Sequence, residues 1–402
     1  MRILHLSTTT IGGAGVVAST IAKRSLLDGH EVLLLTLNNR GNKLARQKKR
    51  NILQRGISQA NTVFSELDTK DKWGQLTSTS RSANLLDDVI VFSPEVIHIH
   101  NWFNLLNSTD IKRLIERFPC VFHVHDARLM TGGCHFTLDC TEYLNQCSSC
   151  PATNHKKYLV KKSYRKYDNV FTEFSSYGLI FPSRWLQKNF VGSPIYDHAD
   201  VITSATNPIP LEVVDSLLTK KKESIVCVIS QLNAPIKGFD QFLGAIEKLR
   251  DHGNEILVQV VGTNATKNQI EKATQLNVKL LGGLSNSETL QVIGDSELLV
   301  VPSLSENLPT VILEAQAVGT SVLVTAIKGC LELVEEEKTG FVCDPSADSI
   351  FYGINRALDS ENRSDIVDFA KLESRRRISE FDSLMYSTYQ NVIAHHSSKS
   401  RA

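Results

Sequence analysis

Pro302-Ser-Leu-Ser-Glu306-Asn-Leu-Pro-Thr-Val-Ile-Leu-Glu314-Ala-Gln-Ala-Val-Gly319 is the stretch that decides how the second half of the chain folds. It follows the apolar run Leu298-Leu-Val-Val-Pro302, which predicts a buried parallel strand. We expect a helix to begin near Pro309, because proline lacks the N–H that would be unpaired at a first helical position. The helix should stop at Gly319, a residue suited to the left-handed conformation that ends many helices.

Two glutamates of this stretch lie where a ligand can reach them. Glu306 falls in the predicted loop just ahead of the helix N-terminus, and Glu314 falls inside the helix. Free N–H groups at a helix N-terminus attract anions and polar ligands. The two carboxylates could therefore grip a hydroxyl-rich ligand, and a solvated surface pair is the alternative.

The composition indicates a globular protein of two domains. The chain has 402 residues, of which 42% are hydrophobic and 22% charged, values typical of folded domains. A net charge of +1, from 44 basic and 43 acidic residues, argues against nucleic acid as a partner. No apolar run approaches the roughly 20 residues that span a bilayer. Residues 1–7 are too few and too soon polar for a signal peptide, so we expect a cytoplasmic protein.

The N-terminus has the pattern of a Rossmann-type half. Residues 2–37 are predicted as strand, loop, helix and strand, with Gly12-Gly-Ala-Gly15 in the loop. Glycines at such a turn let a ligand phosphate approach the backbone, although a tight turn without a ligand would use them too. Their spacing is not the dinucleotide fingerprint, and Asn38-Asn39 replaces the acidic ribose ligand, which argues against a nicotinamide cofactor.

We expect residues 39–82 to form a loop with short helices. Beyond this loop, two predicted strands end in histidines. One strand ends in His98-Ile-His100 and the other in His123-Val-His125. In an open parallel sheet the carboxyl ends of the strands face the ligand crevice. These histidines are therefore candidates for a site, or else hydrogen-bonded polar residues of the sheet.

Four of the eight cysteines, Cys134, Cys140, Cys147 and Cys150, lie in one short insert at 131–151. The last two form Cys-x2-Cys, which holds two thiolates at the angle that tetrahedral zinc needs. We predict a structural zinc site, with disulfides or free thiols as the alternatives. Four cysteine ligands leave no open coordination position, so we expect no catalytic metal there.

The segment 155–167 is basic and aromatic. It could dock on anionic lipid or on a phosphate-bearing acceptor, or form a solvated helix face.

The second half alternates strands and helices again, which predicts a second doubly wound sheet. Lys237 follows the first strand of this half, where a cation can neutralise a diphosphate; an ordinary surface lysine is the alternative. A proline-rich stretch near 203–210 marks a boundary. We therefore predict an N-terminal Rossmann-like domain at 1–203, a C-terminal Rossmann-like domain at 204–375 and a helical tail at 376–402.

Taken together, these motifs resemble those of the retaining glycosyltransferases of the GT-B fold, family 4. The resemblance runs from Met1 to Phe341 in motif order. The family's Gly-Gly loop, strand-closing histidine, Lys-Gly pair and Glu-x7-Glu unit correspond here to Gly12-Gly13, His125, Lys237-Gly238 and Glu306 with Glu314. The Thr-Gly-Gly-Cys stretch and its cysteines are similar to a subgroup that builds bacterial surface polysaccharides.

The resemblance implies an α/β protein with two Rossmann-like doubly wound domains facing a central cleft. It implies an enzyme of the hexosyltransferase type, which moves a sugar from a UDP- or GDP-sugar to a glycan or polyprenyl-diphosphate-linked acceptor with retention of configuration. No cofactor or divalent metal is expected for catalysis. The protein would be peripheral on the inner face of the membrane.

The resemblance also implies roles for single residues. Glu314 would bind the ribose, Glu306 the hydroxyls of the donor sugar, and His125 the sugar near its anomeric carbon. Lys237 and the amides of Gly12 and Gly13 would stabilise the leaving diphosphate. The backbone of four consecutive residues would contact sugar and phosphate: Asn307, Leu308, Pro309 and Thr310.

Two departures from the family pattern affect donor binding. Gln231 stands where the family has an arginine six residues before its lysine, and it brings no charge. Glu306-Asn-Leu-Pro replaces the family's Glu-Gly-Phe-Gly type of loop. Two other functions stay open: a catalytically impaired nucleotide-sugar-binding partner, and a nucleotide-sugar epimerase on the same fold.

Overall fold

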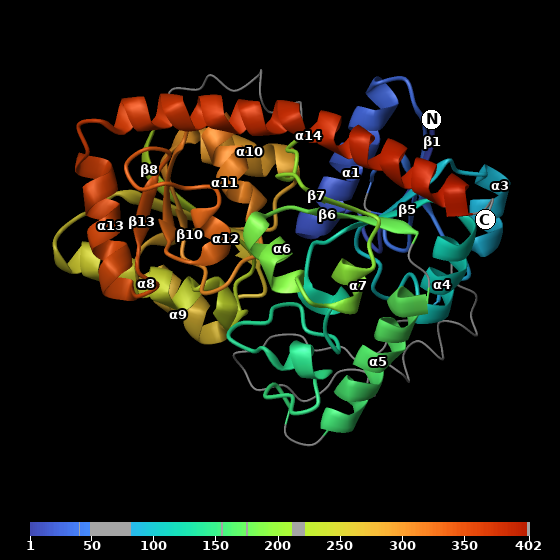
Figure 1. Cartoon of the computed structure of the whole chain (residues 1–402). Coiled ribbons are helices and arrows are strands. Elements are labelled where there is room, and N and C mark those ends of the chain that lie inside the picture. Colours follow the sequence, from blue (N-terminus) through green and yellow to red (C-terminus); the bar gives the residue numbers. More distant parts are fainter. Residues whose placement is uncertain (40, 49–81, 154–155, 174–175, 211–221, 400–402) are drawn as a thin grey trace. The chain divides into compact units, whose positions relative to one another are not determined.

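The computed structural model describes residues 1–39, 41–48, 82–153, 156–173, 176–210 and 222–399. The chain divides into two compact units, Met1–Pro208 with Glu380–Ala402, and Ile209–Ser379. Each unit is a parallel sheet covered by helices on both faces (Figure 1). Most of the predicted loop at 39–82 lies outside the described residues.

The sheet of the N-terminal unit has seven strands, all parallel, in the order β3-β2-β1-β4-β5-β6-β7. Chain order reverses between β1 and β4, which is the topological switch point of a Rossmann sheet. The strands are β1 (Arg2–Leu6), β2 (Glu31–Thr36), β3 (Ala45–Gln47), β4 (Val96–Ile99), β5 (Cys120–His123), β6 (Tyr177–Phe181) and β7 (Val201–Ser204).

Helices cover both faces of this sheet, and the C-terminal part of α14 (Arg363–Lys399) belongs to one of those faces. The other helices of the unit are α1 (Gly12–Leu27), α3 (Leu86–Phe92), α4 (Ser108–Arg117), η2 (Ala127–Leu129), η3 (Glu142–Asn145), α5 (Lys157–Glu173), α6 (Arg184–Phe190) and α7 (Pro194–Asp197).

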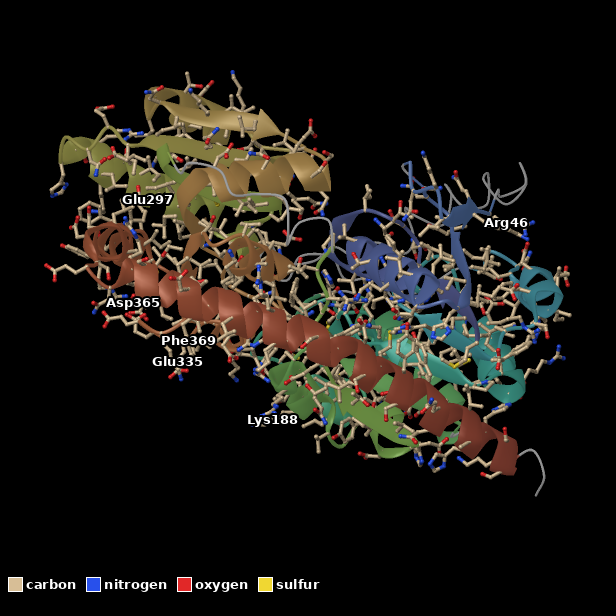
Figure 2. The ribbon with its side chains drawn as sticks, turned by 90° about the horizontal axis from the view of Figure 1, so that it is seen from above. Arg46, Lys188, Glu297, Glu335, Asp365 and Phe369 are labelled. Carbon is tan, nitrogen blue, oxygen red and sulfur yellow. The ribbon has the colours of Figure 1, made fainter. Side chains whose placement is uncertain are left out.

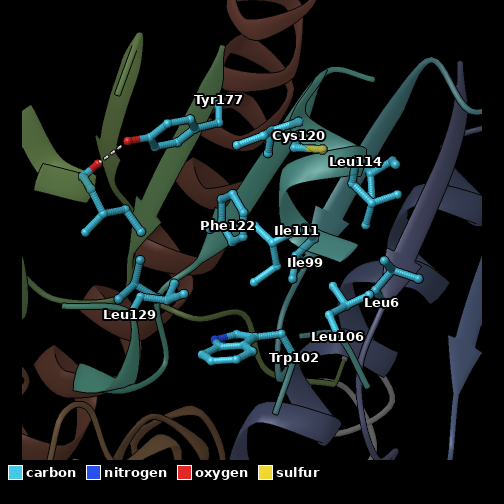
Figure 3. Packing of buried hydrophobic residues seen from close by; sticks show 14 of the residues in the cluster. Leu6, Ile99, Trp102, Leu106, Ile111, Leu114, Cys120, Phe122, Leu129 and Tyr177 are labelled. Atoms are coloured by element: carbon cyan, nitrogen blue, oxygen red, sulfur yellow. Dashed lines mark hydrogen bonds between the residues drawn. The ribbon is translucent and has the colours of Figure 1, made fainter. Parts of the chain in front are cut away.

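Alternation of side chains along the strands builds two separate cores. Successive residues of a strand point to opposite faces. Ile99 and Phe122 pack on one face with Ile111 of α4 (Figure 3), and the ring hydroxyl of Tyr177 there donates to the Ile195 carbonyl at 2.8 Å. The opposite face buries another set of apolar residues against α1 and α14, among them Ile3, Val96, Val121, Phe381 and Tyr389.

The C-terminal unit repeats this topology with six parallel strands in the order β10-β9-β8-β11-β12-β13. Its switch point lies between β8 and β11. The two sheets confirm the predicted doubly wound α/β architecture. The strands are β8 (Lys222–Gln231), β9 (Leu257–Thr263), β10 (Val278–Gly282), β11 (Ser296–Val301), β12 (Ser321–Thr325) and β13 (Phe341–Cys343).

Two cores again flank the sheet of this unit. One core packs α8 and α13 on one face of the sheet, and the other packs α10 and α11 on the opposite face. The helices of the unit are η5 (Pro235–Lys237), α8 (Phe239–Asp251), α9 (Lys267–Gln275), α10 (Asn286–Asp295), α11 (Thr310–Ala317), α12 (Lys328–Leu331) and α13 (Ala347–Asp359), followed by the first part of α14.

Some local predictions differ from the structure. Pro309 is the N-cap of α11, in an extended conformation, and not its first helical residue. Gly319 has φ +75°, as predicted for the residue that follows the helix. The short strand β3 lies in the segment predicted as a loop, with Arg46 on the edge of the sheet (Figure 2). In the described part of the chain, no helix combines the length and apolar content of a membrane span.

Gly238 sets the distance between the loops that follow β8 and β11. Its φ is +71°, and a Cβ placed on it would lie 1.8 Å from the carbonyl oxygen of Pro302. The amide of Leu304 also donates to the carbonyl of Ile236 at 2.8 Å. The two strand ends at the switch point are therefore joined backbone to backbone, and only glycine fits at their contact.

Gly238→Ala should lower the free energy of unfolding of the C-terminal unit by about 3 kcal/mol or more, because it combines a left-handed conformation with a clash. Gly253→Ala is the matched control. Gly253 has φ +74° but no atom within 4 Å of an added Cβ, so only the conformational penalty of about 1 kcal/mol remains. Hydrogen exchange of peptides from this unit in urea measures both. Equal losses would contradict the proposed contact.

Candidate functional site

Lys237 and Glu306 meet at the switch point of the C-terminal sheet. Lys237 ends η5, just after β8, and Glu306 lies in the loop after β11. Their side chains form an ion pair, and the Ser303 hydroxyl donates to the same carboxylate oxygen of Glu306 at 3.0 Å. Both side chains keep some exposure, 22% for Lys237 and 13% for Glu306. A fixed charge pair that solvent still reaches can bind a polar ligand.

The loop that carries Glu306 is held by backbone contacts. A Cβ on Gly329 would lie 2.2 Å from the carbonyl oxygen of Glu306. The Thr325 hydroxyl donates to the Ser303 carbonyl at 2.5 Å. The loop therefore rests against the start of α12 and the end of β12, which fixes the position of its carboxylate.

The N-terminus of α11 lies next to this ion pair in the chain. Asn307, Leu308 and Pro309 are buried, and Thr310 is the half-buried first residue of the helix. Pro309 caps the helix without a side-chain hydrogen bond, and the first turn holds no acidic residue. The first amides of α11 are therefore not neutralised by the helix's own side chains, which favours an anionic or polar ligand.

Glu314 is a buried carboxyl group in α11. It is 6% exposed, and burial raises its pKa to about 7. Within the described residues its carboxyl group has neither a hydrogen bond nor an ion pair. An unpaired buried carboxylate is costly, so a ligand hydroxyl that bonds to it would relieve a penalty already present in the folded chain.

Gln231 and the N-terminal glycines occupy exposed positions. Gln231 is the last residue of β8, aligned with Thr263 of β9. Gly12 and Gly13 begin α1, with no atom within 4 Å of an added Cβ. Gly15 differs, because its Cβ would lie 2.6 Å from the Thr9 carbonyl oxygen. Gly12 and Gly13 therefore leave open space at the uncapped N-terminus of α1, whereas Gly15 is needed for packing.

His125 belongs to a column of five histidines on one face of the N-terminal sheet, together with His5, His98, His100 and His123. In the register of the sheet, His5 of β1 lies opposite His98 of β4. Ile99 of β4 lies opposite Phe122 of β5, so the next residues along, His100 and His123, are neighbours. The rings of His123 and His125 are stacked, with 4.4 Å between their centroids and an angle of 2° between their planes. The column runs toward the carboxyl ends of the strands, where His125 is half-buried.

Hydrogen bonds between ring nitrogens orient the column. His125 Nε2 lies 3.5 Å from His100 Nδ1, and His100 Nε2 lies 3.1 Å from His5 Nδ1. His123 Nε2 is 2.8 Å from the side-chain oxygen of Asn207. His98 Nδ1 is 2.6 Å from the hydroxyl of Tyr389 in α14. The ring of His125 is thus held from behind by His100 and His5.

Burial keeps the column uncharged. Desolvation lowers the pKa of His5 to about 3 and that of His123 to about 4. It also lowers the pKa of His98, His100 and His125 well below the usual value. Two groups, His5 with His98 and His100, and His100 with His123 and His125, have ring nitrogens within 4.8 Å. The ring–ring hydrogen bonds account for much of this closeness.

Two residues of these regions, His5 and Ser303, are not recognisable from the sequence alone. His5 sits mid-strand, and only the register with β4 shows that it continues the column. Ser303, which supports Glu306, carries no motif of its own. The alternate spacing in His98-Ile-His100 was a usable signal, because residues two apart in a strand share a face.

The cysteine insert and the basic segment lie elsewhere in the N-terminal unit. All four insert cysteines border one small cavity. The described part of the segment 155–167 belongs mostly to α5. Its buried side, with Val160, Tyr164 and Tyr167, faces the unit, and the exposed side carries lysines, an arginine and a tyrosine: Lys157, Tyr158, Lys162, Arg165 and Lys166.

Family models match both halves of the chain. Residues 11–202 match the model described as Glycosyltransferase Family 4, and residues 212–380 match the model described as Glycosyl transferases group 1. Together the two models span most of the sequence, one on each Rossmann-like half.

Known relatives are glycosyltransferases as well. An uncharacterised glycosyltransferase of Methanocaldococcus jannaschii is 26% identical over 69% of this chain and 70% of its own length. The colanic acid biosynthesis glycosyl transferase WcaC of Escherichia coli, itself assigned only by inference, is 22% identical over 81% and 83%. The crystal structure of Anabaena HepE with UDP and glucose matches with a TM-score of 0.63 at 18% identity, over 99% of this chain and all of that one, which shows a shared fold.

Acidification should destabilise the N-terminal unit through the histidine column. Unfolded histidines bind protons below pH 6.5, whereas His5 and His123 do so only near pH 3 to 4. The unfolded state therefore holds more protons in this window, and stability falls as the pH falls. A plot of the free energy of unfolding against pH should therefore slope upward in this window. We expect His5→Leu to reduce that slope by about 1.4 kcal/mol per pH unit.

Tryptophan fluorescence in urea follows this unit, because Trp73, Trp102 and Trp185 are the three tryptophans of the chain. His252→Gln, which replaces an exposed histidine of the other unit, should leave the slope unchanged. If His5→Leu also left the slope unchanged, the pH dependence would not come from the lowered pKa of His5.

Glu314→Gln should stabilise the free protein at pH 8 by roughly 2 to 3 kcal/mol. The raised pKa of Glu314 means that the unfolded chain loses this proton first, so the wild type loses stability as the pH rises from 4.5 through about 7. The glutamine variant carries no such charge. Urea unfolding at pH 8 and pH 4.5 tests this, with the gain expected only at pH 8; a loss of stability at pH 8 would show that the carboxylate has a partner in the fold.

Proposed function

The chain belongs to family 4 of the GT-B glycosyltransferases, and we propose that it transfers a sugar from a UDP- or GDP-sugar to a glycan or lipid-linked acceptor with retention of configuration. The observation that carries this proposal is the Lys237–Glu306 ion pair at the switch point of the C-terminal sheet, beside the uncapped N-terminus of α11. Switch points are where open α/β sheets bind their ligands.

In this proposal the C-terminal unit supplies most of the groups that bind the nucleotide-sugar donor. Glu314 accepts hydrogen bonds from the ribose hydroxyls, and Glu306 accepts them from the sugar. The ammonium group of Lys237 neutralises the diphosphate, and the amides around Asn307, Leu308, Pro309 and Thr310 contact sugar and phosphate, Pro309 through its carbonyl only. Gln231 adds a neutral hydrogen-bond donor at the end of β8.

The N-terminal unit contributes the remaining groups. His125 contacts the donor sugar near its anomeric carbon, and its neutral imidazole can accept or donate a hydrogen bond without adding charge. The amides of Gly12 and Gly13, at the N-terminus of α1, bind the diphosphate.

The chemistry we assign is attack from the same face as the departing group. The acceptor oxygen bonds to the anomeric carbon while the bond from that carbon to the diphosphate oxygen breaks, and the acceptor's proton passes to the leaving phosphate. Lys237 and the helix N-termini stabilise the charge that develops on the diphosphate. In this proposal the reaction proceeds without a divalent metal and without any other catalytic cofactor.

The acceptor side of the proposal rests on α5 and on the relatives. The exposed basic and aromatic side of α5 suits a phosphate-bearing or lipid-linked acceptor at an anionic membrane surface. WcaC is named for the synthesis of colanic acid, a polysaccharide. We therefore place the reaction in the synthesis of a bacterial surface polysaccharide, with the enzyme peripheral on the inner face of the membrane.

Glu306→Gln should reduce turnover by about 100-fold or more, because the variant loses the charge that grips the sugar and steadies Lys237. Glu335→Gln is the control: Glu335 lies on the surface of the same unit (Figure 2) in an exposed pair with Lys338. Turnover is measured as the nucleotide released from UDP- and GDP-sugars, with a lipid-linked oligosaccharide extract as the acceptor. The assay is run once with magnesium and once with EDTA. Proton NMR of the product reports its anomeric configuration.

Full activity of Glu306→Gln would overturn the role of that residue. A product of inverted configuration would overturn retention, and loss of turnover in EDTA would overturn the metal-independent step. Nucleotide-sugar binding in a thermal-shift assay with no turnover on any acceptor would instead indicate a binding partner, and interconversion of the donor sugar without an acceptor would indicate an epimerase.

A further inference from the structure

The cysteine insert surrounds a cavity of ionic size. Cys134, Cys140, Cys147 and Cys150 all line one small cavity of about 10 Å³, together with Thr137 and Tyr143. Such a volume matches roughly one small sphere, the size of a single water or metal ion. The other cysteines of the chain sit apart from this insert, and three of them are single thiols in the main cores: Cys120, Cys227 and Cys330.

Backbone amides point at two of the sulfurs. Gly132 donates to Cys147 Sγ at 3.3 Å, and Glu142 donates to Cys140 Sγ at 3.4 Å. Amide donors to sulfur are the outer contacts that metal-bound thiolates use.

The backbone of the insert is strained at one of the cysteines and at the residue before it. Gln146 and Cys147 have φ of +54° and +53°, successive left-handed residues without glycine. Each such residue costs on the order of 1 kcal/mol or more. The apolar cluster beneath is small and consists largely of the cysteines themselves, with Ala152, Val160 and Tyr164. A segment with so little core needs a further constraint to hold this geometry.

We propose that the four cysteines bind one structural zinc ion. Four sulfur ligands around a small cavity are the donor set of tetrahedral zinc. The four thiols release their protons as the ion binds, and the ion's charge compensates the buried thiolates. The sulfurs are not among the described groups whose ligand atoms lie within 4.8 Å of one another, so zinc binding requires these side chains to draw closer than they lie in this structure.

The zinc braces the loop that follows His125. The amide of Ala127 donates to the His135 carbonyl at 3.1 Å. Asp126 pairs with Arg128 at 2.9 Å, and its carboxylate lies 3.7 Å from His135. The insert is therefore joined directly to the chain that leaves β5. This role is structural, and it stands whatever reaction the protein catalyses.

Metal analysis of the full chain, purified without a histidine tag, tests the proposal. We expect one zinc per chain by elemental mass spectrometry. Cys147→Ser should lose most of this zinc, whereas Cys343→Ser, outside the insert, should retain it. Cobalt-loaded wild-type protein should show the sulfur-to-cobalt charge-transfer absorption of a tetrahedral thiolate site, a readout that does not depend on whether Cys147→Ser folds.

Three results would overturn the proposal. Wild-type protein without metal, whose mass or thiol titration shows disulfides in the insert, would assign the cysteines to covalent pairs. Wild-type protein without metal and with four reactive insert thiols would make them plain packing residues. Zinc retained in Cys147→Ser, with a cobalt spectrum lacking sulfur bands, would place the ion on the histidine column instead.

Discussion

The contact between Gly238 and the carbonyl of Pro302 is the constraint on which the C-terminal site depends. It joins the loops after β8 and β11 at the point where the strand order reverses. Because the two backbones touch, the side chains of Lys237 and Glu306 lie close enough to form an ion pair, and the Ser303 hydroxyl donates a hydrogen bond to the carboxylate. Gly329 repeats the device from the other side of the same loop. The charged side chains are thus placed by backbone packing, which a bound ligand does not need to assemble.

The two units provide different electrostatic environments. The C-terminal site combines a charged pair with a buried carboxyl group whose pKa lies near neutrality. The N-terminal histidines form a neutral, stacked column with few partners beyond each other, Asn207 and Tyr389. Desolvation is the main cause in both cases: it penalises the charged form, so it raises the pKa of Glu314 and lowers that of the histidines. At both places the folded chain therefore buries ionisable side chains at a cost in stability.

Much of this could be predicted from the sequence, and the rest depends on register and long-range packing. Apolar runs and glycines predicted both Rossmann halves, and the motif order led to the family that the comparisons confirm. Lys237 and Glu306 were recognisable as strand-end residues, but their ion pair was not, because 69 residues separate them. His5 could not be added to the histidine column without knowing that β1 pairs with β4. Tyr389, 291 residues from its partner His98, gave no local signal at all.

The last helix gives the order of synthesis a physical meaning. One face of the N-terminal sheet is closed by residues of α14 beyond Glu380, including Phe381, Met385 and Tyr389, and Asp382 pairs there with the buried guanidinium of Arg24. While a ribosome is still making the second half of the chain, this apolar face and its histidines lack the part of their cover that α14 supplies. The first half to emerge is therefore the last to be completed, and a nascent chain stalled before α14 presents a hydrophobic surface of the kind that chaperones recognise.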